Sequence, residues 1–152
     1  MWWASLDAPA WRIGQLTDML TPDEVDRANR FGVDVEIVRT IADLEGIAEH
    51  FFSPRECASL RALGPHERTA GFFNCWTRKE AYIKATGLGL TQPLDTFEVE
   101  LRPRAPALLL TIDGDPHLAA GWSLHDLDAP PAVTAALAMK GSARNLITYW
   151  LN

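Results

Sequence analysis

The sequence predicts an α+β fold, with helices in the first part of the chain and short strands in the second. A pair of capping signals opens helices, the segment Gly32–Glu36 alternates strictly between apolar and acidic residues, and short apolar runs separated by turns follow residue 96. Segregated helices and strands are typical of this class, and short strands joined by turns favour antiparallel pairing. We therefore expect an antiparallel sheet packed against a long helix.

The first 31 residues are expected to form a strand and a helix. Residues 1–6 fit a short strand. Thr21 and Glu24 form a capping-box pattern around Pro22, which occupies the favoured first helical position, and the helix is expected to end near residue 30 or 31.

A strand is predicted directly after this helix. Side chains of a strand repeat every two residues, so Val33 and Val35 share one face while Asp34 and Glu36 share the other. The pattern by itself is common, and its usual explanation is a solvent-facing acidic side.

Three further helices are expected next. The first covers residues 40–52, and the second begins at a second capping box, Ser53–Glu56, and stops at Gly64. The long helix covers residues 68–86 and is closed by Gly87, which can adopt the left-handed conformation of a helix end.

The rest of the chain is predicted to be β-structure, with a turn at residues 113–115. The expected strands are residues 97–101, 107–112, 121–127, 132–139 and 146–150.

Composition narrows the class of protein. The chain has 152 residues, 47% of them hydrophobic and 22% charged, which is enough for one domain with a core. A net charge of −6 argues against general nucleic-acid binding. No apolar run is long enough to cross a membrane, and the first residues lack the features of a signal peptide. Cys57 and Cys75 match no zinc or disulfide pattern, so we expect a cytoplasmic protein.

Glu80 is the most informative residue of the long helix. It lies within a stripe that should face a core and that contains Phe72, Phe73, Trp76, Lys79, Glu80 and Ile83. An unpaired buried carboxylate costs several kcal/mol, so Glu80 needs a cation or a functional role. A salt bridge to Lys79 or Lys84 is the simpler alternative, and Trp76 is expected to pack in the core.

A metal site follows if the long helix packs on the acidic face of the strand. Asp34, Glu36 and Glu80 would then converge, and like charges need a cation between them. Carboxylate oxygens with waters suit Mg²⁺, which commonly binds substrate phosphates. Lys79 and Lys84 flank this position and are suited to phosphate oxygens. The set of groups favours phosphoryl-type transfer assisted by a metal.

Four segments resemble the 4′-phosphopantetheinyl transferases. Gly32–Glu36 resembles their G-(I/V)-D-(I/V)-E motif, residues 51–56 their F-(F/S)-x-x-E segment, and residues 76–84 their W-x-x-K-E-(A/S)-x-x-K signature. Residues 20–31 are similar to the L-(S/T)-x-x-E-x-x-R-A-x-R-F helix of the two-lobed, surfactin-type branch. All occur in the order of that family, and the resemblance implies its α+β lobe.

The resemblance implies a reaction and its site. Such enzymes move 4′-phosphopantetheine from coenzyme A to a serine of an acyl or peptidyl carrier protein and release 3′,5′-ADP. The carrier proteins serve fatty acid, polyketide or nonribosomal peptide synthesis. By matching position, Asp34, Glu36 and Glu80 would hold Mg²⁺, and Glu80 would also act as the base. Lys84 would contact phosphate and assist the departing one, while Lys79 would stabilise charge nearby.

The chain departs from the two-lobed pattern at the junction of Phe31 and Gly32. Residues 1–31 resemble a remnant of the N-terminal lobe and residues 32–152 the C-terminal lobe. The stretch that normally separates them, with its G-K-P-like and N-x-S-H-S-like nucleotide-gripping segments, does not occur here. The remaining lobe should expose an apolar surface, so we expect a homo-oligomer like the single-lobe holo-acyl-carrier-protein synthases.

Three functions remain open from the sequence. The first is an active transferase. The second is an inactive remnant that keeps the carboxylates but binds only a carrier protein or another subunit. The third is a structural α+β domain whose carboxylates coincide by chance.

Overall fold

The computed structural model describes residues 31–141. The predicted strand at residues 1–6, the helix at 21–31 and the strand at 146–150 lie outside this range, except that Phe31 is the first residue of a strand. The predicted division of the chain at residues 31 and 32 concerns the same region and stays a prediction.

The strands form two antiparallel sheets, as the turn-linked apolar runs predicted. The larger sheet has the order β1 (Phe31–Ile37), β5 (Val133–Lys140) and β4 (Trp122–Asp126). The smaller sheet pairs β2 (Phe97–Val99) with β3 (Leu109–Ile112). Each strand matches a predicted one to within two residues at either end.

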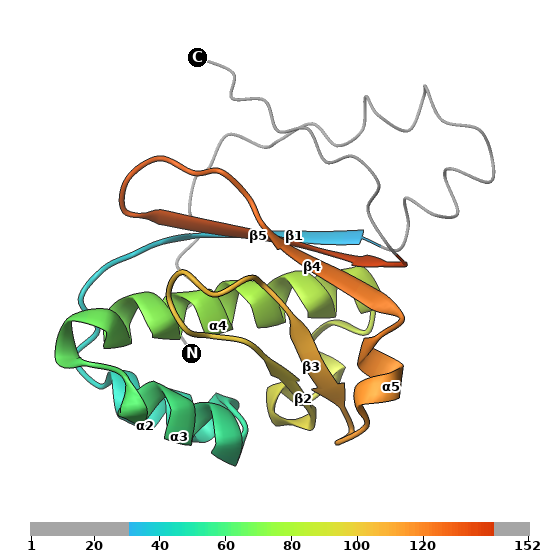
Figure 1. The fold of residues 1–152 in the computed structure, drawn as a ribbon, viewed down its shortest axis with the longest axis horizontal. Helices are drawn as coiled ribbons and strands as arrows, with labels where there is room; N and C mark the ends of the chain where they lie inside the picture. Colours follow the sequence, from blue (N-terminus) through green and yellow to red (C-terminus); the bar gives the residue numbers. More distant parts are fainter. Residues whose placement is uncertain (1–30, 142–152) are drawn as a thin grey trace.

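The long helix α4 (Pro65–Thr86) is the central element of the fold. It begins three residues before the predicted start, because Pro65 occupies the first helical position, where its missing N–H costs nothing. It ends as predicted at Gly87, whose φ of 72° is left-handed. Figure 1 shows α4 running along the three-stranded sheet, with α2, α3 and the smaller sheet on its other side.

The two helices before α4 are short. Helix α2 (Leu44–Phe51) starts four residues later than predicted, because Asp43 caps it by accepting a hydrogen bond of 3.0 Å from the amide of Gly46. Helix α3 (Pro54–Ala62) has the predicted capping box: Ser53 and Glu56 each accept a hydrogen bond from the other's backbone amide.

Three short helical turns were not predicted from the sequence. Their bounds are Gly89–Thr91 for η3, Leu94–Thr96 for η4 and Pro116–Ala119 for α5. Each is a single turn, too short to produce a helical period in the sequence.

The predicted fold class is confirmed: the fold is α+β, with an antiparallel sheet packed against a long helix. Helix α4 is covered on nearly every side, and the core around it is aromatic-rich, with Phe72, Phe73 and Phe97 all buried. Within residues 31–141, no helix has the length and apolar character needed to cross a membrane.

Gly32 lets β1 lie directly on α4. A Cβ atom at this position would overlap the carbonyl oxygen of Ala81 and the amide nitrogen of Ala85. The strand and the helix backbone therefore touch here with no side chain between them. This contact decides which face of β1 meets the helix.

Candidate functional site

Strand β1 turns its acidic face inward and part of its apolar face outward. Asp34 is only 7% exposed, whereas Val35 is 44% and Ile37 47% exposed. Asp34 and Glu36 share the face of Gly32, which is in contact with α4. The acidic side of the strand is therefore an interior surface, contrary to the usual explanation of such a pattern.

Glu80 faces this acidic side from α4. Its carboxyl is partly buried, and burial is the largest cause of its raised pKa. The negative charges of Asp34 and Glu36 raise that pKa further, while Lys84 opposes them. The structure thus brings the three predicted carboxylates close enough to influence one another's ionisation.

Asp34 has one satisfied and one unsatisfied oxygen. The amine of Lys84 donates a hydrogen bond of 2.6 Å to Asp34 Oδ1, while Oδ2 is buried without a hydrogen-bond partner. Burial raises the pKa of Asp34 although Lys84 lowers it. A buried carboxylate oxygen without a partner is costly and needs an explanation.

The pKa of Glu36 is raised first by burial and then by the charge of Asp34. Arg39, Lys84 and a side-chain hydrogen bond from Trp76 oppose this rise. Neither Arg39 nor Trp76 was expected at the site from the sequence. The one signal for Arg39 was its place just beyond the strand, three residues after Glu36.

The three carboxylates form a candidate donor set for a divalent ion. Among the described residues 31–141, there is no group of three or more His, Cys, Asp or Glu side chains with the geometry of a metal site. The chemistry nevertheless fits Mg²⁺: the donors are carboxylate oxygens, one buried oxygen lacks a partner, and all three pKa values are raised. The amine of Lys84 supplies the positive charge beside Asp34.

Lys79 is not brought to the carboxylates. Its side chain is fully buried, and its amine lies 2.8 Å from a carboxylate oxygen of Glu56. The neighbouring residue Arg78 is also buried and binds Asp126 on β4 at 2.6 Å. Successive helical residues are about 100° apart, so Arg78, Lys79 and Glu80 leave α4 in three directions.

The simpler explanation of Glu80, a salt bridge to Lys79 or Lys84, is not what the structure shows. Lys79 pairs with Glu56 and Lys84 with Asp34. No ion pair among the described residues includes Glu80.

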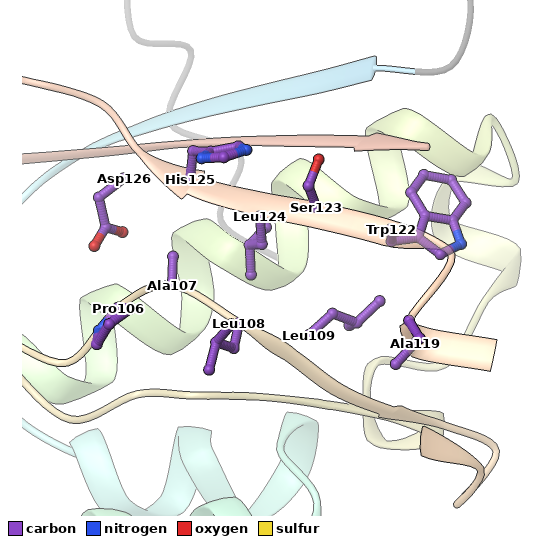
Figure 2. Close-up of a pocket in the computed structure, with 11 residues that line it drawn as sticks. Pro106, Ala107, Leu108, Leu109, Ala119, Trp122, Ser123, Leu124, His125 and Asp126 are labelled. Carbon is purple, nitrogen blue, oxygen red and sulfur yellow. The ribbon is translucent and has the colours of Figure 1, made fainter. Parts of the chain in front are cut away.

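A cavity of about 590 Å³ lies away from these carboxylates. It is formed between β4 and the segment that leads into β3, and Figure 2 shows Leu124 pointing toward that segment while Ser123 points the other way. Its lining includes Asp126, the ion-pair partner of Arg78. The side chain of Arg78 leaves α4 about 200° around the helix axis from that of Glu80. None of the predicted site residues lines it.

Comparison with known proteins supports one family. The model of the 4′-phosphopantetheinyl transferase superfamily matches residues 30–137. The chain is 40% identical over 117 residues to 4′-phosphopantetheinyl transferase HetI of Nostoc sp. (strain PCC 7120), a match that covers 77% of this chain and 46% of HetI. It is 44% identical over 70 residues to 4′-phosphopantetheinyl transferase Sfp of Bacillus subtilis, covering 46% of this chain and 30% of Sfp.

The fold is similar to that of the holo-[acyl-carrier-protein] synthase of Thermotoga maritima. The TM-score is 0.54 at 22% sequence identity, over 74% of this chain and 63% of that one. The chain spans less than half the length of the two relatives HetI and Sfp. The extent of the family match is decisive: the chain belongs to the 4′-phosphopantetheinyl transferase superfamily.

Proposed function

We propose that the protein transfers the 4′-phosphopantetheine group of coenzyme A to a serine of an acyl or peptidyl carrier protein. The observation that carries the proposal is the inward-facing acidic side of β1, which places Asp34 and Glu36 opposite Glu80 in a member of this superfamily. A solvent-facing acidic strand would support no such role.

The three carboxylates would hold Mg²⁺. Bound there, the ion would neutralise charge on the pyrophosphate of coenzyme A. Asp34 contributes a buried oxygen that has no other partner. Burial raises the pKa values of all three groups, and the charge of Asp34 raises those of Glu36 and Glu80 further. Lys84, whose side chain is half exposed, is placed to move from Asp34 to a phosphate oxygen.

The transfer forms one P–O bond and breaks another. The hydroxyl oxygen of the carrier serine attacks the phosphorus atom bonded to the pantetheine arm, and its proton passes to Glu80, directly or through a water. The bond from that phosphorus to the bridging oxygen breaks, and the electron pair leaves with 3′,5′-ADP. Lys84 stabilises the charge that develops on the departing phosphate.

The proposal gives Lys79 no contact with substrate. Its amine has no exposed surface and already lies beside Glu56. The lysine function at the phosphates therefore falls to Lys84 alone among the two predicted lysines.

The nucleotide end of coenzyme A would be held with the help of a second copy of the chain. The nucleotide-gripping segments of two-lobed relatives do not occur in this sequence. Val35 and Ile37 expose apolar surface on the outer side of β1, the strand that carries the carboxylates. Such a surface fits a homo-oligomeric contact beside the site.

The test is a transfer assay with apo-carrier protein, coenzyme A and Mg²⁺, read by the mass of the carrier. We expect the carrier to gain the mass of one phosphopantetheine group, and Glu80→Gln to abolish the gain while circular dichroism stays unchanged. No gain at high concentrations of protein and substrate would reject the proposal. Gain by the Glu80→Gln variant would reject the role of Glu80.

A second candidate is a catalytically inactive module that binds a carrier protein or another subunit. It is favoured by one observation: the nucleotide-gripping segments of two-lobed relatives do not occur between Phe31 and Gly32. Binding of apo-carrier protein in a calorimetric titration, together with no mass gain, is the result expected of this candidate.

A further inference from the structure

The pair of Glu56 and Lys79 is the most completely buried ion pair among the described residues. The two side chains are 2% and 0% exposed, and the amine lies 2.8 Å from the carboxylate. The family resemblance had placed Lys79 at the substrate. The structure places it in the interior, one residue before the carboxylate that the proposed reaction needs.

Every hydrogen-bonding group of the pair is used. Besides the ion pair, the amine of Lys79 donates to the carbonyl oxygens of Leu94 at 2.7 Å and Phe97 at 2.5 Å. Glu56 Oε1 accepts from the amide of Val99 at 2.8 Å, and Oε2 accepts from the amide of Ser53 at 2.9 Å. The contacts therefore tie α4 to the start of α3, to η4 and to β2.

Stability alone does not account for this arrangement. Removing two charges from water is costly, and apolar side chains of similar volume often stabilise a core equally well or better. Directional contacts supply something that apolar packing does not. Several bonds of fixed length and angle at one residue restrict both the rotation of a helix about its axis and its movement along that axis.

Glu80 depends on that restriction. Gly32 sets how closely β1 approaches α4, but a backbone contact without a side chain leaves the rotation of the helix less defined. Residues of a functional site must be held within about 0.5 Å by a supporting shell of contacts. Glu80 follows Lys79 directly, so any rotation of α4 that breaks the Lys79 contacts also turns Glu80 away from Asp34 and Glu36.

We infer that Glu56 and Lys79 form a positioning pair, which directs Glu80 toward Asp34 and Glu36 through the rotation of α4. The inference rests on the proposed function, because it assumes that the three carboxylates bind a divalent ion. It assigns Lys79 a role through Glu80 and not through contact with coenzyme A.

The test measures binding of Mn²⁺ alone to the metal-free full chain, by the electron paramagnetic resonance signal of free Mn²⁺. The variant Glu56→Gln with Lys79→Met removes both charges together and so leaves no unpaired buried ion. We expect its dissociation constant for Mn²⁺ to rise about tenfold, as for other groups that orient metal ligands. Glu56→Asp keeps the charge but shortens the side chain, and should give a smaller rise in the same direction.

Leu60→Ala is the matched control. Leu60 is 1% exposed on α3, and its truncation lowers stability while both charges of the ion pair are kept. Its Mn²⁺ affinity, measured where the variant is folded, should equal that of the unmodified protein. If the pair had a purely structural role, the double variant would lose stability but keep its affinity for Mn²⁺, as this control does.

The outcomes separate the inference from the proposed function. Suppose that the unmodified protein binds Mn²⁺. An unchanged dissociation constant in the double variant or in Glu56→Asp then overturns the inference alone. Absence of Mn²⁺ binding by the unmodified protein overturns the metal-dependent function and the inference with it.

Discussion

The amine of Lys84 lies 2.6 Å from Asp34 Oδ1, across the contact between α4 and β1, while the other oxygen of Asp34 is buried without a partner. Lys84 thus partly compensates a group of three carboxylates whose pKa values are all raised. If the three carboxylates bind a divalent ion as proposed, their charges are incompletely compensated while that ion is absent.

Asp34→Asn should therefore stabilise the metal-free protein. The substitution removes a buried charge that burial disfavours, and it keeps nearly the same shape. We expect the thermal midpoint in a chelator to rise by a few degrees, and the stabilisation by added Mg²⁺ to disappear. Calorimetry with and without Mg²⁺ checks both effects. A lower midpoint in the chelator would contradict the view that Asp34 is held at a cost.

The stability of the metal-free protein should depend on pH in a direction set by the same groups. The folded-state pKa values of Asp34, Glu36 and Glu80 lie above their ordinary values, so the folded chain binds protons more tightly than the unfolded chain. Their contribution to stability is fully present below the unfolded pKa values and is lost as pH rises through the folded ones.

In a chelator, we therefore expect the unfolding free energy of the unmodified protein to increase relative to that of Asp34→Asn as the pH is lowered from neutral into the mildly acidic range. The difference between their unfolding free energies, from urea titrations at several pH values, checks this. In Mg²⁺ the trend should reverse, because protons compete with the ion for the same oxygens. A difference independent of pH would show that the pKa of Asp34 is not raised in the folded protein.

Gly32→Ala should disrupt the contact between β1 and α4. The added Cβ overlaps backbone atoms of Ala81 and Ala85, which cannot move aside as a flexible side chain can. We expect a loss of about 1–3 kcal/mol or more in unfolding free energy. Gly121→Ala is the control: its Cβ would come no closer than 3.6 Å to the carbonyl oxygen of Leu118, and its effect should stay within about 0.5 kcal/mol. Equal stabilities of the two variants would refute the close approach.

The exposed apolar residues of β1 should support self-association. Sedimentation is expected to show a mass above that of one chain, and Val35→Lys should shift the protein toward the monomer. Leu118→Lys, at a similarly exposed apolar residue on α5, should leave the mass unchanged. A stable, well-folded monomer of the unmodified chain would end the proposal of a homo-oligomer.

Local signals in the sequence predicted most of the described elements. The capping box of Ser53 and Glu56, the alternation of β1 and the terminal Gly87 are features of a few neighbouring residues, and each predicted its element correctly. The segments that resemble the transferases also predicted the family, which the match over residues 30–137 confirms. The predicted start of α2 at residue 40 is wrong, because the helix begins after Asp43, an ordinary N-cap residue.

The sequence by itself determined most of the described elements, the family and the pair of acidic residues on one face of β1, because these depend on propensity, spacing and order along the chain. Only the tertiary structure decided which face of β1 is interior and which carboxylate each lysine meets. Those outcomes depend on how α4 lies on the sheet, where Gly32 permits backbone contact and the roughly 100° step between Lys79 and Glu80 sends one side chain to Glu56 and the other toward Asp34 and Glu36. Neighbours in sequence thus acquire different partners, and no pattern along the chain contains that information.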